Sequence, residues 1–201
     1  MMSIRPLKAN DLAALALLHQ QVHPGFFLTR MGRPFLVAYY SVILKEGGIL
    51  LGLEEEGRLV GMAAGFLHPA AFYGSLRKSR VKFAWLSFLA LLKSPSLLPA
   101  IFENSRSVRE DGRRRRNGTA QVCELAAIGV HPDFRGGARG RQLGEAFIAE
   151  ARARGAKQLR ASTDAHENDA ARAYHAGLGF LEGEEYEVGG GRRMIALEKE
   201  L

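Results

Sequence analysis

The chain has 201 residues, of which 47% are hydrophobic, and a formal net charge of +7. This size and composition support a substantial core, and we expect one domain over residues 1–201. No apolar run is long enough to span a bilayer and no signal peptide is recognisable, so the sequence predicts a cytoplasmic protein. Its single cysteine, Cys123, excludes an intramolecular disulfide, and its place in an apolar run favours a structural thiol.

The first half of the chain is predicted to hold a strand, two helices and a hairpin. The strand covers residues 4–7, and the amphipathic helix after it, at 12–22, is capped by Asn10 or Asp11. A second helix begins near Pro34. Two apolar runs at 49–54 and 59–67, separated by a charged turn containing Gly57, indicate an antiparallel hairpin.

Residues 72–116 form a helical segment that carries most of the positive charge. Residues 76–116 contain eleven Lys or Arg and three Asp or Glu, a local net charge of +8. The apolar residues at 83–92 are too dense for one narrow helical stripe and too few to cross a bilayer. We expect a packed helix pair broken at Pro95 and Pro99, with a substrate lid, a dimer contact or an interfacial membrane contact as alternatives.

The run at 113–116 consists of four arginines. It lacks interleaved aromatic residues and a recognised nucleic-acid-binding module, which favours a solvated loop over a nucleic-acid contact.

A near-continuous apolar run at 122–130 predicts a strand buried on both faces and stopped by Pro132. Gly129 inside this run indicates a bulge or a close approach of another backbone. A second strand is predicted at 157–163, and the segments 184–188 and 193–197 are typical of a closing hairpin.

The turn at 135–140 is rich in arginine and glycine and leads directly into an amphipathic helix that ends at Gly155. Unpaired backbone N–H groups at a helix N-terminus, together with arginine side chains, favour binding of a pyrophosphate. The spacing of the glycines fits neither a Walker A loop nor a dinucleotide-binding G-x-G-x-x-G turn.

This turn resembles the acetyl-CoA signature of the GNAT superfamily of N-acetyltransferases, Arg/Gln-x-x-Gly-x-Gly/Ala. Arg135 and Gly140 match it, and Ala138 stands at the usual first glycine, where a methyl group is tolerable only without a positive φ. Asn168, Ala171 and the Leu-Gly-Phe sequence at 178–180 also match the superfamily at the expected spacing.

The resemblance implies an α/β fold with a mixed central sheet of about six to seven strands flanked by helices, in which residues 72–116 are a helical insertion. It also implies acetyl-CoA as co-substrate. The residues expected to contact it are Ile128, Gly129, Val130, Arg135, Gly136, Gly137, Ala138, Arg139, Gly140, Arg141, Asn168 and Ala171. Asn168 has a competing role as a helix N-cap. We expect no metal, because His19 and His23 share helical spacing but have no third ligand nearby in the sequence.

For the chemistry, Glu124 is the candidate base, acting through water on the acceptor amine; alternatively it is a carboxylate at the solvated end of the strand or in an ion pair. The superfamily commonly places a tyrosine proton donor where this chain has His175, and Tyr174 precedes it. The general acid is therefore either His175 or Tyr174. If neither residue donates the proton, both have a structural role.

The resemblance thus predicts an N-acyltransferase that moves an acetyl or other acyl group from acyl-CoA to a primary amine by direct transfer in a ternary complex. The acceptor is a small molecule or a protein, and the insertion is a candidate homodimer contact. The alternative is a CoA-binding sensor or assembly module of the same fold without catalysis.

Overall fold

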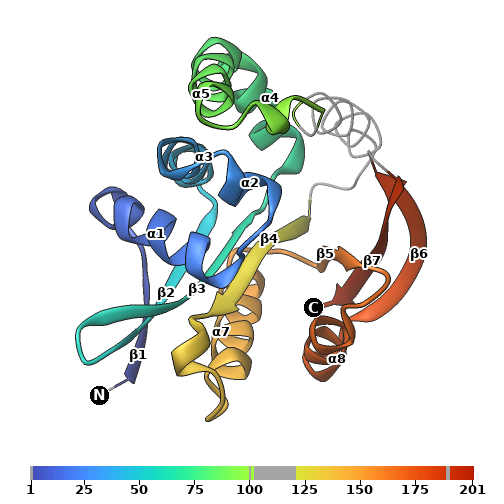
Figure 1. Ribbon diagram of the computed structural model, residues 1–201. Coiled ribbons are helices and arrows are strands. Elements are labelled where there is room, and N and C mark those ends of the chain that lie inside the picture. Colours follow the sequence, from blue (N-terminus) through green and yellow to red (C-terminus); the bar gives the residue numbers. More distant parts are fainter. Residues whose placement is uncertain (1, 100, 102–120, 189–190) are drawn as a thin grey trace.

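The computed structural model describes residues 2–99, 101, 121–188 and 191–201, and its centre is a seven-stranded sheet (Figure 1). The strands are β1 (Met2–Pro6), β2 (Ile49–Glu55), β3 (Arg58–Phe66), β4 (Val122–Val130), β5 (Gln158–Asp164), β6 (Leu181–Val188) and β7 (Arg192–Glu200). Their order is β1-β2-β3-β4-β5-β7-β6. Among these described strands β4 and β5 are parallel, and every other neighbouring pair is antiparallel. The mixed sheet expected from the sequence is confirmed.

Helices cover both faces of this sheet. Within the described residues the α-helices are α1 (Leu12–Val22), α2 (Phe27–Arg30), α3 (Arg33–Lys45), α4 (Pro69–Lys78), α5 (Arg80–Lys93), α7 (Arg139–Ala153) and α8 (Asp169–Gly177). Short 3-10 turns lie at Ala9–Asp11, Pro95–Leu97 and Pro132–Phe134. α1 and α3 lie on one face of the sheet, and α7 and α8 lie on the other (Figure 1).

The alternation of side chains along β4 supplies apolar groups to both layers. Cys123 and Leu125 are buried with Phe147 of α7, whereas Ala127 packs into the cluster formed by α1 and α3. Burial raises the pKa of the Cys123 thiol to about 12, which keeps the thiol protonated and fits the structural role expected for it.

The turn between β2 and β3 has the geometry that its sequence predicts. Glu56 and Gly57 both have positive φ angles, 51° and 75°, the requirement of a type I′ hairpin turn. This turn fixes the end of β2, and with it the side chain of Glu55.

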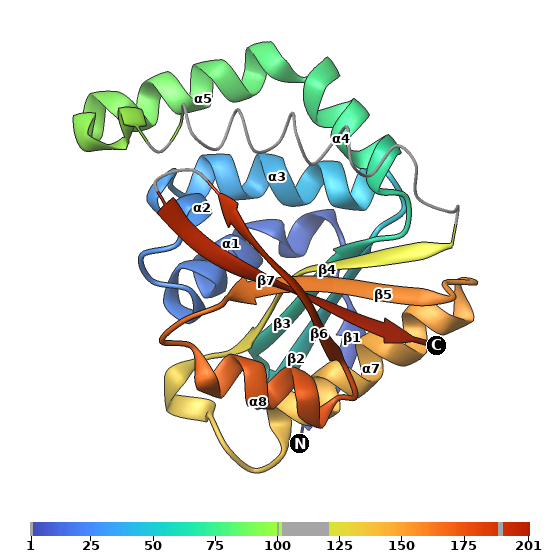
Figure 2. The same cartoon turned by 90° about the vertical axis from the view of Figure 1, so that its right-hand side faces the viewer.

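The described part of the segment 72–116 consists chiefly of α4 and α5, which meet at Ser79. α5 lies over α3 on the side away from the sheet (Figure 2). α4 begins at Pro69, slightly before the boundary expected from the sequence. The arginine run at 113–116 lies outside the described residues. Across the described ranges, no helix combines the length and the apolar character needed to cross a membrane.

Candidate active site

The strands β4 and β5 diverge after a short common ladder. Their pairing runs from Val122 to Glu124 on β4, opposite residues 158–160 of β5, and goes no further between these two described strands. On its other side, β4 continues to pair with β3 as far as Val130. β5 therefore does not pair with residues 125–130, and the edge of β4 that faces β5 is open over this stretch. Such an edge can bind an extended amide-containing ligand.

A β-bulge in β4 increases this divergence. Leu125 pairs with Gly65 and Ala127 with Ala64, so Ala126 is an extra residue on β4. Bulges bend a strand and turn its side chains, and Ala126 is exposed.

The sequence predicted a bulge or a close approach of another backbone at Gly129; in the structure the bulge lies at Ala126, and side chains at the end of α1 pack against Gly129. A Cβ atom at Gly129 would lie 2.2 Å from Cγ1 of Val22 and 3.5 Å from Cε1 of His23. The end of α1 therefore rests directly on β4.

Glu124 occupies the last paired position before the strands diverge, opposite Phe66 of β3 and Arg160 of β5. Its neighbours Cys123 and Leu125 face α7, so its side chain projects from the face that carries α1 and α3. The carboxylate is half-buried, and the open edge of β4 begins immediately after it. This position suits the expected role of Glu124 at the reacting end of the cofactor.

The turn before α7 bends through three consecutive left-handed residues. Gly136, Gly137 and Ala138 have φ angles of 96°, 55° and 60°. Ala138 thus adopts the positive φ that the sequence analysis named as the unfavourable case for a methyl group, at a cost of about 1 kcal/mol. The turn leads into the first turn of α7, where the N–H groups of Gly140 and Arg141 have no acceptor within the helix.

The arginines expected to contact phosphate have different partners. Arg135 is exposed at the turn. Arg141 pairs with Glu145 one helical turn later, and because both side chains are more than half exposed, the pair is easily separated. Arg139 instead donates to Glu55 at the end of β2, which ties the turn to the β2–β3 hairpin and leaves Arg135 and Arg141 as the cations best placed for a ligand.

Asn168 and Ala171 lie at the start of α8. Asn168 is the N-cap residue, but its side chain makes no cap hydrogen bond; Nδ2 donates to Oγ1 of Thr163 at 2.6 Å. This bond holds the amide against the end of β5, the strand that diverges from β4.

Both candidate proton donors are hydrogen-bonded to backbone carbonyls. The hydroxyl of Tyr174 donates to the carbonyl of Gly140 at 2.8 Å and so reaches the first turn of α7. Nδ1 of His175 lies 2.7 Å from the carbonyl of Ala171, and because a carbonyl only accepts, Nδ1 carries the proton. Burial lowers the pKa of His175 and raises that of Tyr174, so both side chains are neutral near neutral pH.

The sequence analysis considered His19 and His23 only as metal ligands, and it did not predict that His23 lies against Gly129 of β4 with His19 beside it. The rings lie 5.0 Å apart, and Nδ1 of His19 shares a 2.6 Å hydrogen bond with the hydroxyl of buried Tyr40. Burial lowers the pKa of His19 to about 3 and that of His23 to about 4, with Arg135 contributing to the second shift. No group of three or more metal-binding side chains occurs within the described part of the chain.

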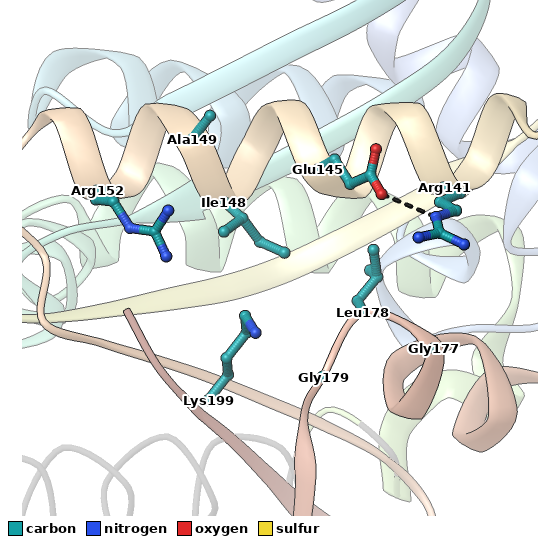
Figure 3. Close-up of a pocket in the computed structure, with 9 residues that line it drawn as sticks. All are labelled: Arg141, Glu145, Ile148, Ala149, Arg152, Gly177, Leu178, Gly179 and Lys199. Atoms are coloured by element: carbon teal, nitrogen blue, oxygen red, sulfur yellow. Dashed lines mark hydrogen bonds and ion pairs between the residues drawn. The ribbon is translucent and has the colours of Figure 1, made fainter.

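A groove of about 480 Å³ lies between α7 and the segment after α8. Arg152 of α7 and Lys199 of β7 extend along it, and the Arg141–Glu145 pair stands at one end (Figure 3). Of the residues expected to contact the cofactor, Arg141 alone lines the groove. The groove is therefore separate from the edge of β4 and its turn.

A parallel strand pair opens beside a helix N-terminus in this fold, and comparisons with known proteins find similar sequences and structures. The family model described as the acetyltransferase (GNAT) family matches residues 106–180. A comparison with curated protein sequences found no match.

Solved structures resemble the whole chain. A ribosomal-protein-alanine N-acetyltransferase from Brucella melitensis is 21% identical, with 99% of each chain covered and a TM-score of 0.65. The Salmonella typhimurium protein yncA, solved with its cofactor acetyl-CoA, is 20% identical over 100% of this chain and 94% of that one, with a TM-score of 0.64. An N-acetyltransferase from Staphylococcus aureus Mu50 is 17% identical, covers 100% and 98%, and has a TM-score of 0.63.

At these identities the structures establish the fold, and the family model supplies the sequence signature. This chain therefore has the fold of these acetyltransferases, and its residues 106–180 match the acetyltransferase (GNAT) family model.

Proposed function

We propose that this protein transfers an acetyl group from acetyl-CoA to a primary amine, directly and within a ternary complex. The observation that carries the proposal is the continuous path from the open edge of β4 to the left-handed turn and the N-terminus of α7. One end of the path offers unpaired strand backbone to an amide-containing arm, and the other offers N–H groups and arginine to a pyrophosphate. Acetyl-CoA carries an amide-containing pantetheine arm followed by a pyrophosphate, in the order of these two binding features. The Salmonella typhimurium structure contains acetyl-CoA.

Along this path the backbone at Ile128, Gly129 and Val130 would hold the pantetheine arm. A strand N–H of the open edge on the Glu124 side would polarise the thioester carbonyl, because a fixed donor stabilises the charge that develops on that oxygen during acyl transfer. The turn residues, with Arg135 and Arg141, would hold the phosphates, and Asn168 and Ala171 would border the cofactor from α8.

The attacking amine must lose a proton, and an alkyl ammonium has a pKa of about 10.4. Glu124 is the proposed base, through a water molecule, because it stands where the open edge begins. The neutral ring of His23, which rests on Gly129, adds no positive charge to repel an approaching ammonium group.

Of the two candidate acids, we assign proton donation to Tyr174. Its raised pKa keeps its proton, although the hydroxyl would have to exchange its bond to Gly140 for the thiolate sulfur during turnover. His175 would have to be an imidazolium to donate from Nε2, and burial disfavours that form.

Tyr174→Phe should therefore lower kcat with little change in KM for acetyl-CoA, whereas His175→Asn, which keeps a donor toward Ala171, should mainly change stability. Equal kcat in Tyr174→Phe and the wild type would refute the assignment.

A second function, CoA binding without catalysis, is favoured by one observation: both candidate acids already donate their protons to backbone carbonyls. A catalyst would have to exchange one of these bonds during turnover, whereas a sensor would not.

Thermal shift with acetyl-CoA, CoA and ATP, followed by an amine screen for thiol release, separates these functions. A ligand at roughly 100 times its Kd adds about 2.7 kcal/mol to the free energy of unfolding, which raises Tm by about 5–10 °C for a chain of this size. Stabilisation by acetyl-CoA but not by ATP, with thiol released in the presence of an amine, is the expected result. Binding without release for every amine tested would favour the sensor, and no shift with any CoA species would overturn both functions.

A further inference from the structure

The outward face of α5 carries a stripe of large apolar side chains in contact with solvent. Val81, Trp85, Phe88, Leu89 and Leu92 are 77%, 60%, 48%, 38% and 66% exposed. Their spacing of four, three, one and three residues places them on one side of a helix. The rings of Trp85 and Phe88 stack at 5.7 Å and still remain open to solvent. We call these five residues the α5 stripe.

The opposite side of α5 already attaches the helix to the protein. Phe83 packs edge-on against Phe35 of α3 at a centroid distance of 5.1 Å. Ala90 is buried with Met31 and Leu97. The helix therefore has a complete inward contact, and the α5 stripe is additional to what folding needs.

Positive charge surrounds the stripe. Exposed cations lie at both ends of α5 and at the end of α4, namely Arg77, Lys78, Arg80, Lys82 and Lys93. The sequence contains no aspartate or glutamate from residue 57 to residue 102. Apolar and aromatic side chains with flanking cations and no acids are typical of helices that lie in the interface of an anionic membrane.

We propose that the α5 stripe docks on an anionic lipid surface, with α5 lying in the plane of the membrane. α5 has 14 residues and does not meet the requirements for crossing a bilayer. The side chains of the stripe would enter the acyl boundary while the surrounding cations meet lipid phosphates. This inference is independent of the proposed acetyl transfer, and it reverses the preference for a merely packed helix pair that the density of apolar residues suggested.

Charge argues against a second copy of the chain as the occupant. In a two-fold dimer the same surface meets itself, so the cations around one stripe would face those around the other. Neither copy would bring an acidic residue from α4 or α5 to compensate. An anionic lipid surface removes this repulsion and turns the same charges into an attraction.

The single tryptophan of the chain makes the proposal directly measurable, because Trp85 belongs to the stripe. The full chain is mixed with vesicles of phosphatidylcholine alone or of phosphatidylcholine with phosphatidylglycerol, and both Trp fluorescence and co-sedimentation are recorded. The expected result is a blue shift and co-sedimentation with the anionic vesicles, much reduced with the neutral ones and reversed by salt.

Three variants locate the contact. Leu92→Ser should weaken binding, whereas Leu181→Ser, at an equally exposed leucine of β6, should not. Lys82→Gln should lower the partition coefficient for anionic vesicles roughly fivefold, the effect of removing one cation near the surface. Circular dichroism and the acetyl-CoA thermal shift monitor the fold in each variant.

The other outcomes overturn the proposal. A blue shift that grows with protein concentration in the absence of vesicles, with a dimer in sedimentation equilibrium, would assign the stripe to a second copy. Equal loss of binding in Leu92→Ser and Leu181→Ser would place the lipid contact elsewhere. No co-sedimentation with anionic vesicles at low salt would exclude the lipid surface.

Discussion

Arg139 at the start of α7 is bound by Glu55 at the end of β2 through two parallel hydrogen bonds. Nε donates to Oε2 at 2.9 Å and Nη2 donates to Oε1 at 2.8 Å. The carboxylate raises the pKa of the guanidinium, and the guanidinium lowers that of Glu55. The pair joins the proposed phosphate turn to the β2–β3 hairpin.

If this pair positions the turn, Arg139→Met and Glu55→Gln should have similar effects on acetyl-CoA binding, since each removes one partner. A direct phosphate contact predicts a different pattern, in which Arg139→Met weakens binding and Glu55→Gln leaves it unchanged or improved by freeing the arginine. Calorimetric Kd values for both variants and the double variant decide between the patterns. We expect the first.

Ala138→Gly should stabilise the protein by about 1 kcal/mol, because glycine adopts φ near 60° without the clash that a methyl group makes. Tm should rise by about 2–4 °C. The matched control is Ala149→Gly in the interior of the same helix, where the substitution should cost about 1 kcal/mol. If Ala138→Gly and Ala149→Gly both lowered the stability, the turn would not hold the left-handed geometry in solution.

Gly140→Asp should abolish acetyl-CoA binding without loss of stability. A Cβ at this position meets only Cε2 of Tyr174 at 3.5 Å, an ordinary contact, and a carboxylate in the first turn of α7 is favoured by the helix dipole. The same carboxylate would repel the phosphates. Gly140→Ala is the control and should still bind; loss of the thermal shift in both variants would indicate steric blockage instead of charge repulsion.

Glu124→Gln should reduce kcat by roughly 100-fold or more, the usual contribution of a general base, and leave the Kd for acetyl-CoA unchanged. Simultaneous loss of binding and turnover would show that Glu124 holds the site together and is not the base.

Stability should fall between about pH 6.5 and pH 4, because His19 is buried as a neutral ring. Its pKa is about 3 in the folded protein and about 6.5 in the unfolded chain, so the unfolded state binds more protons throughout that interval. The contribution is fully present above pH 6.5 and amounts to about 2 kcal/mol lost by pH 4.5. Urea unfolding of the wild type and His19→Gln at both pH values measures it; an unchanged pH slope in the variant would assign the effect to other groups.

Local patterns were sufficient to predict much of the fold. The apolar run at 122–130 became β4, and the glycine after Glu56 became the positive-φ corner of the β2–β3 turn. In both cases the decisive information lies within a few neighbouring residues.

The features that the sequence did not predict depend on contacts between residues that are far apart in the chain. Glu55 and Arg139 are 84 residues apart, and nothing in either local pattern indicates their contact. The phase of α8 sends Tyr174 toward α7 and His175 into the core, which a motif position cannot reveal. The dense apolar residues of α5 likewise did not indicate which side would face α3.

The short ladder between β4 and β5 also bears on how cooperatively the protein unfolds. Within the sheet, the two halves are connected at this point by three residue pairs, and α8 adds the packing of Leu178 against Gly144 and the hydrogen bond from Tyr174 to Gly140. Amide protons along this ladder should therefore exchange with solvent through a subglobal opening of lower free energy than complete unfolding. A molecule bound between the strands would contact both halves, slow this exchange and sharpen the thermal transition.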